Sequence, residues 1–178
     1  MNDKPETSRE SDTSKPRVRT FSWGDPAIGA DVARSSSGVD FVRKIMLGEV
    51  PAPPIMDLVD FRLVKVEPGA VSFEFEPAEI HYNPMGGVHG GIVSTLLDSA
   101  MGLSVLSQLP PGSGFSTLEI KVNFVRGITE ETGTLRAEGK IVHPGAKVAT
   151  AEARLVDRQG KLYAHGTTTC IILRETER

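Results

Sequence analysis

The sequence predicts an α+β fold in which a single antiparallel sheet curves around one long apolar helix. Two strand-like runs precede a long helical run and four follow it, with turn residues between them. Runs of strands with one helix are typical of α+β architectures. The helical run, from about Gly90 to Gln108, is apolar on nearly every side. A helix of that kind has to be enclosed by other elements.

The N-terminal part of the chain changes character near residue 37. Residues 1–37 are rich in Ser, Thr, Pro and charged residues, which predicts a mostly disordered tail. We therefore place one folded domain at residues 38–178. Its first element is a helix over "SGVDFVRKIMLGE", where apolar residues recur at helical spacing. Ser37 can cap this helix and Gly48 can end it.

Alternation with a period of two then predicts the strands. Residues 61–66 and 70–76 flank the turn Pro68-Gly69, and Pro110 stops the long helix. The four later strands are expected at residues 116–125, 133–142, 146–156 and 162–173. In the first of these, one face is predicted to carry Leu118, Ile120, Val122 and Phe124. A curved open sheet has exposed edges, which pairing between two subunits would cover.

Composition excludes several classes of protein. The 178 residues are 39% hydrophobic and 24% charged, and the net charge is -3. A chain without a basic field is a poor nucleic-acid binder. The N-terminus has no apolar signal-peptide core, and no apolar run reaches the roughly 20 residues of a membrane span. One cysteine fits a reducing compartment. We expect a cytoplasmic protein that binds neither nucleic acid nor membrane.

One carboxylate in the long helix needs an explanation. From Tyr82 to Leu118, Asp98 is the only Asp, Glu, Lys or Arg. The same helix begins at Gly90 and Gly91, whose unobstructed N–H groups and helix dipole favour negative charge. The developing oxyanion of an ester or thioester is such a charge. With His81, Asn83 and His89 just upstream as possible donors, these residues predict a hydrolase site.

The spacing constrains where that site can lie. Gly90 and Asp98 are eight residues apart, which is about 12 Å along a helix. One carbonyl group cannot contact both, because catalytic contacts are near 3 Å. Two chains with antiparallel helices would place Gly90 of one subunit near Asp98 of the other. The site, if present, is therefore expected between subunits.

Other interpretations of these residues stay open. Asp98 could be structural, bonded to backbone or to Ser/Thr, and the glycine pair could serve only close packing. No "GxGxxG" or P-loop pattern supports a nucleotide site. The four histidines and the cysteine lack metal-binding spacing, so we predict no metal site and no cofactor. Cys170 is expected to be a core residue.

At these residues the sequence resembles the PaaI-like acyl-CoA thioesterases, a hotdog-fold family. The family pattern "HxNxxGxxHGGxxxxLxDxA" is matched at its diagnostic positions, from His81 through Asn83, His89 and Gly90 to Asp98. The resemblance covers about residues 38–174 and includes "TLEIKVNFVR". One departure is Gly127, where family members often have proline after the arginine.

The resemblance implies a hotdog dimer, often assembled as a homotetramer, that binds acyl-CoA between subunits. It implies that the Gly90 N–H polarises the thioester carbonyl and that Asp98 acts as general base or nucleophile. Asn83 would orient water or thioester, His89 would support the loop, and Thr117 would assist the water. The remaining substrate-binding candidates are Gly91, His81, Arg126, His143, Gly145 and Lys147, with Lys147 available to a phosphate. No cofactor is implied, since CoA is part of the substrate.

Three functions are consistent with these residues. The first is hydrolysis of a small, medium or aromatic acyl-CoA to free acid and CoA. The second is a non-catalytic acyl-CoA-binding module on the same fold. Binding alone gives no reason for a carboxylate near the thioester. The third is an acyl-CoA hydratase or dehydratase, which needs an Asp/His pair on one substrate. His89 precedes Gly90 and does not join Asp98.

Overall fold

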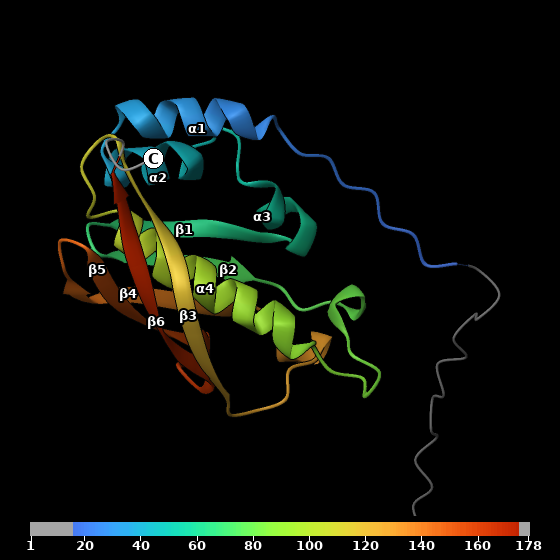
Figure 1. The fold of residues 1–178 in the computed structure, drawn as a ribbon. Helices are drawn as coiled ribbons and strands as arrows, with labels where there is room; N and C mark the ends of the chain where they lie inside the picture. The colour runs from blue at the N-terminus through green and yellow to red at the C-terminus, as the bar shows by residue number, and fades with distance from the viewer. Residues whose placement is uncertain (1–15, 175–178) are drawn as a thin grey trace, which may run out of the picture.

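A curved six-stranded sheet wraps the central helix in the computed structural model, which describes residues 16–174 (Figure 1). All its neighbouring strands pair antiparallel, in the order β1-β2-β4-β5-β6-β3. The predicted α+β fold is confirmed. The elements are α1 (Pro26–Ser35), α2 (Gly38–Met46), α3 (Pro54–Val59), β1 (Phe61–Glu67), β2 (Ala70–Phe75), η1 (Glu79–His81), α4 (Gly90–Leu106), β3 (Ser113–Phe124), η2 (Glu130–Thr132), β4 (Leu135–Pro144), β5 (Val148–Asp157) and β6 (Leu162–Arg174).

The central helix α4 lies against β2, β3, β4, β5 and β6. Its side chains Leu96, Leu97, Ala100, Met101 and Val105 are fully buried. The opposite face of α4, which carries Asp98, is only half-buried, and its small and apolar residues leave the helix without an amphipathic pattern. Among the described residues, no helix is long and apolar enough to cross a membrane.

Two small residues bring the sheet close to α4. A Cβ at Gly139 of β4 would lie 2.3 Å from the Ala100 carbonyl oxygen, so only glycine fits there. Ser104, fully buried on α4, accepts a hydrogen bond from the Val71 N–H at 3.1 Å and donates to the Ala100 carbonyl at 2.7 Å. These contacts fix α4 against β2 and β4.

The N-terminal segment differs from the expectation of a mostly disordered tail at residues 26–35, which form α1. The Asp25 side chain accepts a hydrogen bond from the Ala27 N–H, and Pro26 occupies the first turn. Both residues favour a helix start, although the composition of the segment predicts disorder. Residues 1–15 lie outside the described part of the chain. The helix predicted after Ser37 is confirmed as α2, with Ser37 as its cap.

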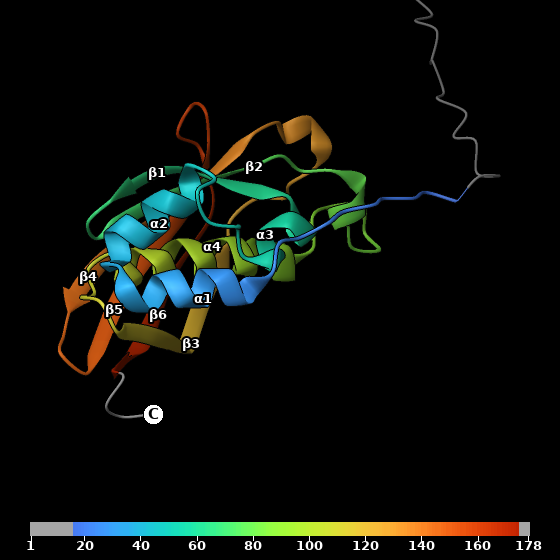
Figure 2. The ribbon, with the colours of Figure 1, turned by 90° about the horizontal axis from the view of Figure 1, so that it is seen from above.

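The helix α1 lies over α4, between β3 and α2, as Figure 2 shows from above. The Arg34 carbonyl accepts a hydrogen bond from the Gly112 N–H at 3.0 Å, which ties the end of α1 to the start of β3. A Cβ at Gly24 would lie 2.6 Å from Pro51, so the chain entering α1 is packed against the α2–α3 connection. The segment is therefore part of the fold.

A β-bulge in β3 changes which side chains face α4. Thr117 pairs with Cys170, and Glu119 pairs with the next residue along β6, Thr169, so Leu118 is extra. A bulge of this kind shifts the alternation by one residue. Thr117 and Ile120 therefore both face inward, whereas Leu118 is 58% exposed. The prediction that Leu118 shares a face with Ile120 is wrong for this reason.

Candidate active site

The N-terminus of α4 presents one free backbone donor. The His89 side chain caps the helix by accepting a hydrogen bond from the Gly91 N–H at 2.9 Å. The His89 carbonyl accepts from Ile92 and Val93. Within residues 16–174, the Gly90 N–H has no acceptor. This N–H, at the positive end of the helix dipole, is the group that can bind an oxyanion.

The loop before α4 is held by Asn83. Its side-chain oxygen accepts hydrogen bonds from Met85 N–H at 2.8 Å and Gly87 N–H at 3.4 Å. Gly86 has a φ of +81°, which an L side chain rarely adopts. Because the oxygen of Asn83 is used within the loop, its amide nitrogen is the end that can donate to a ligand.

His81 lies beneath this loop and away from a ligand. It is 5% exposed, its ring packs on Phe75 with centroids 4.9 Å apart, and its Nδ1 accepts from the Ala78 N–H at 3.0 Å. Burial, reinforced by the charge of Arg19, lowers the pKa of His81. The structure thus places this candidate as a neutral support of the loop.

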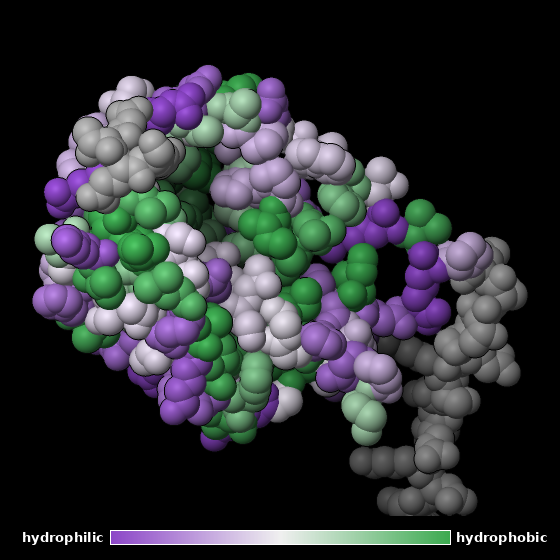
Figure 3. All heavy atoms as spheres, viewed as in Figure 1, coloured by the Kyte–Doolittle hydropathy of each residue, from purple (hydrophilic) through white to green (hydrophobic). Residues whose placement is uncertain are grey.

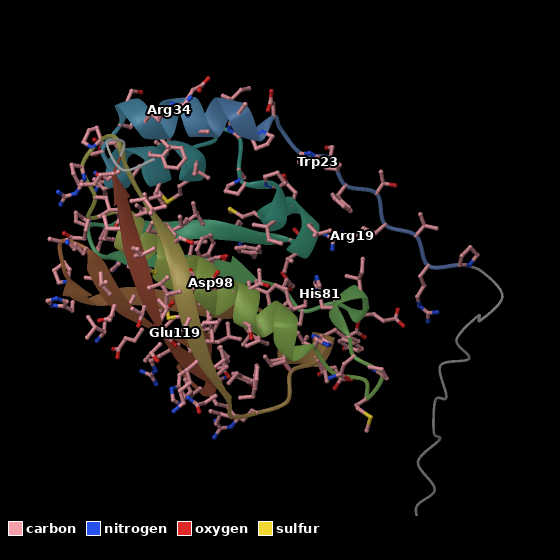
Figure 4. All side chains as sticks on the ribbon, viewed as in Figure 1. Arg19, Trp23, Arg34, His81, Asp98 and Glu119 are labelled. Atoms are coloured by element: carbon pink, nitrogen blue, oxygen red, sulfur yellow. The ribbon has the colours of Figure 1, made fainter. Side chains whose placement is uncertain are left out.

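Asp98 is half-buried on α4, where the helix passes beside β3 (Figure 4). Its Oδ1 accepts a hydrogen bond from Thr117 Oγ1 at 3.0 Å. The bulge at Leu118 lets Thr117 face the helix while Ile120 also stays on the inward side. The two residues that the sequence indicated separately are in direct contact.

Cys170 stands directly across from Thr117 on β6 and is fully buried. Burial is the main reason that its pKa is raised, and the nearby carboxylates of Asp98 and Glu119 add to the effect. The thiol therefore stays protonated at neutral pH. Its position agrees with the predicted core role and gives Thr117 a packed neighbour.

A second group of candidates gathers at the N-terminal end of α4. A cavity of about 350 Å³ brings Asn83 and Arg126 together. The Arg126 guanidinium donates to the Leu162 carbonyl, which fixes its stem against β6. The Phe124 ring packs over Gly90, 3.1 Å from where a Cβ would stand. The alternation in this strand predicts only an apolar face for Phe124, and no local pattern reveals its contact with Gly90.

The candidates His143, Gly145 and Lys147 lie at the other end of the molecule. Gly145 lines a small cavity together with Gln108 and Leu109, which follow the C-terminus of α4. The helix has 17 residues, so its ends are about 25 Å apart. Within one chain, the structure therefore does not bring these residues to Asn83, Gly90 and Arg126.

Metal binding finds no support in the part of the chain that the structure describes. No group of three His, Cys, Asp or Glu side chains in residues 16–174 is arranged to hold a metal ion.

Comparison with known proteins places this geometry in a family. Residues 85–164 match the model of the thioesterase superfamily. A protein of Saccharolobus solfataricus, assigned as an esterase, is 31% identical over 69% of this chain and 86% of its own length. The 1,4-dihydroxy-2-naphthoyl-CoA hydrolase of Listeria monocytogenes is 23% identical over 66% of this chain and 94% of its own length.

Solved structures agree with the sequence relatives. A phenylacetic acid degradation-related protein of Ralstonia eutropha JMP134, assigned as a thioesterase, superposes with a TM-score of 0.67 and 26% identity. The match covers 73% of this chain and 98% of that one. A curved sheet around a central helix that begins at a glycine pair and carries a carboxylate defines a hotdog-fold hydrolase. The chain belongs to the thioesterase superfamily and is a thioester hydrolase.

Proposed function

We propose that this protein hydrolyses a small, medium-chain or aromatic acyl-CoA at a site shared by two subunits. The observation that carries the proposal is the distribution of the functional groups along α4. The free Gly90 N–H lies at one end of the helix, and Asp98 with its Thr117 donor lies about 12 Å further on. One subunit cannot bring both to the same carbonyl. A second subunit with an antiparallel helix can.

Each group has a defined part in the reaction. The Gly90 N–H of one subunit binds the thioester oxygen and stabilises its negative charge in the tetrahedral intermediate. Asp98 of the partner subunit takes a proton from water, which attacks the carbonyl carbon. The carbon–sulfur bond then breaks. The proton on Asp98 passes to the departing sulfur, so CoA leaves as the free thiol. Thr117 holds the carboxylate in place.

The shared site also unites the two separated groups of substrate-binding candidates. Antiparallel helices bring the turn at residues 143–147 of one subunit towards Asn83 and Arg126 of the other. Lys147 and Arg126 can then pair with CoA phosphates. The exposed edge strand β3 offers a surface for the dimer, and the homotetramer is part of the proposal as a dimer of such dimers.

The relatives support the substrate class. The Listeria relative is named as a hydrolase of an aromatic acyl-CoA, and the Ralstonia structure as a protein of phenylacetic acid degradation. Free-thiol release from straight-chain and phenylacetyl-type CoA thioesters tests the proposal. We expect turnover of at least one substrate by the wild type, and binding without turnover by Asp98→Asn. If neither protein hydrolyses any thioester but both bind one, the acyl-CoA-binding module is the better function.

A pair of variants tests the free N–H of Gly90. Proline is compatible with the first helical position, and His89 has the extended backbone that a following proline requires. Gly90→Pro therefore removes the donor while keeping the helix. Gly90→Ala is the matched control, because it places the same Cβ against Phe124 and keeps the N–H. We expect the kcat of Gly90→Pro to be at least about 100-fold lower than the kcat of Gly90→Ala.

Mixing two inactive variants tests whether the site is shared. Asp98→Asn and Gly90→Pro subunits, unfolded and refolded together, form heterodimers with one intact site. Random pairing restores about a quarter of wild-type activity if the site lies between subunits. If each site belongs to one chain, the mixture stays as inactive as its components.

A further inference from the structure

A separate cavity lies under the N-terminal helix, and none of the groups that the proposed chemistry uses lines it. It measures about 260 Å³, and its walls come from α1, the end of α4 and the start of β3. Figure 3 shows the molecule hollowed just below α1, with hydrophobic residues in the hollow. The lining residues are Ala30, Ala33, Arg34, Leu106, Gly112, Ser113, Gly114 and Phe115.

Two elements, β3 and α4, connect the cavity to Asp98. On β3, Phe115 lies two residues before Thr117 on the same inward face. Its ring packs against Gly102, 2.6 Å from where a Cβ would stand, and Gly102 is about one turn of α4 beyond Asp98. Leu106, at the far wall, is eight residues from Asp98, or about 12 Å.

The lining is suited to a hydrocarbon. Alanine, leucine, phenylalanine and glycine make most of it, and Ser113 adds one hydroxyl. The one charged lining residue is Arg34, whose guanidinium is paired with Asp31 and whose carbonyl accepts from Gly112. Burial of apolar surface is therefore the main interaction that the cavity offers a ligand.

We propose that this cavity holds the far end of a medium-chain acyl group whose thioester carbonyl lies at Asp98. The proposal rests on the proposed function and adds chain length to it. The helix α1 forms the roof, and Ala30 and Ala33 leave the room that longer side chains would fill. The composition of residues 1–37 predicts a disordered tail, so no sequence pattern indicates this cavity.

Filling the cavity from α1 provides the test. Ala33→Leu and Ala33→Phe reduce the space in two steps, whereas Ser35→Phe adds an aromatic ring on the opposite side of the same helix. The measurement is kcat/KM for butyryl-, octanoyl- and dodecanoyl-CoA. Each buried methylene contributes about fourfold to binding. We expect Ala33→Phe to lower kcat/KM for octanoyl-CoA at least about tenfold, with butyryl-CoA unchanged and Ala33→Leu intermediate.

Several outcomes would overturn the inference. An equal fall for butyryl- and octanoyl-CoA, or the same loss in Ser35→Phe, would show a general effect on the fold. Unchanged kinetics in all three variants would show that the acyl chain runs elsewhere. A change of molar mass in size-exclusion chromatography with light scattering, confined to the Ala33 variants, would show that another subunit covers this face.

A binding experiment separates this inference from the proposed function. S-Octyl-CoA, a thioether that lacks the thioester carbonyl, is titrated into wild type and Ala33→Phe by calorimetry. Weaker binding to the variant supports the cavity even if no thioester is turned over. Turnover of thioesters with equal thioether affinity for both proteins supports the enzyme and rejects the cavity.

Discussion

The Thr117 hydroxyl donates a hydrogen bond to the carboxylate of Asp98 at 3.0 Å. The two residues come from different elements, β3 and α4, and the bulge at Leu118 lies directly beside Thr117. A carboxylate that must take a proton from water at one position benefits from a fixed orientation.

We expect Thr117→Val to lower kcat about 10- to 100-fold and to leave KM nearly unchanged. Valine keeps the shape of threonine but cannot donate, so only the orientation of Asp98 is lost. Thr117→Ser retains a hydroxyl and should recover most of the activity. Steady-state kinetics on the best acyl-CoA substrate measures both. Equal activity of the valine and serine variants would contradict a role for the hydroxyl.

Removal of the bulge is predicted to be more damaging than removal of its side chain. Deleting Leu118 keeps Thr117 and Ile120 on the inward face, because Glu119 then alternates between them, but it removes the bend and the extra twist that the bulge gives β3 beside Asp98. We expect loss of thioester hydrolysis and a lower free energy of unfolding. Leu118→Ala, at a side chain that is 58% exposed, should change the free energy of unfolding by less than about 0.5 kcal/mol.

Circular dichroism confirms that each protein is folded before urea titration and activity assay. Full activity of the deletion variant would mean that the pairing of β3 with β6 adjusts without cost to Thr117.

The sequence predicts the fold here because its signals are local. The two-residue alternation and the turn residues define the strands, and the all-round apolar helix requires enclosure. Ser37 defines the start of α2 by its side chain. The part of the site that is continuous in sequence, from Asn83 through Gly90 to Asp98, could be predicted.

What the sequence missed depends on tertiary contacts. The bulge is set by how β3 pairs with β6, which leaves Leu118 exposed although it alternates with polar residues. Composition concealed α1, because Asp25 and Pro26 signal a helix start within a polar segment. The packing of Phe124 on Gly90 joins residues that are 34 positions apart, and periodicity contains no such information.

The close approach of β4 to α4 leads to a stability prediction. We expect Gly139→Ala to lower the free energy of unfolding by about 1–3 kcal/mol, because the new Cβ would lie 2.3 Å from the Ala100 carbonyl oxygen. Gly127→Ala is the matched control, since no atom lies within 4 Å of its Cβ position. Urea unfolding at one fixed protein concentration compares the two, because assembly contributes to apparent stability. Equal stability of both variants would contradict the packing.

The buried His81 predicts a pH dependence of stability. Burial lowers its folded-state pKa below the ordinary value of about 6.5. The unfolded chain therefore binds a proton first as the pH falls, so stability is full above about pH 6.5 and declines as the pH approaches the folded-state pKa. Glu74 and Asp157 also have lowered pKa values, but they titrate below about pH 4.5 and do not share this window.

The measurement is urea unfolding of wild type and His81→Gln at pH 7.5, 6.5 and 5.5. Glutamine is uncharged at every pH, so we expect the decline between pH 6.5 and pH 5.5 to become smaller in this variant. The exposed His143→Gln should retain the wild-type slope. If His81→Gln shows the full wild-type decline in stability, other groups cause the pH dependence. If His143→Gln reduces it as much, the burial of His81 does not explain the dependence.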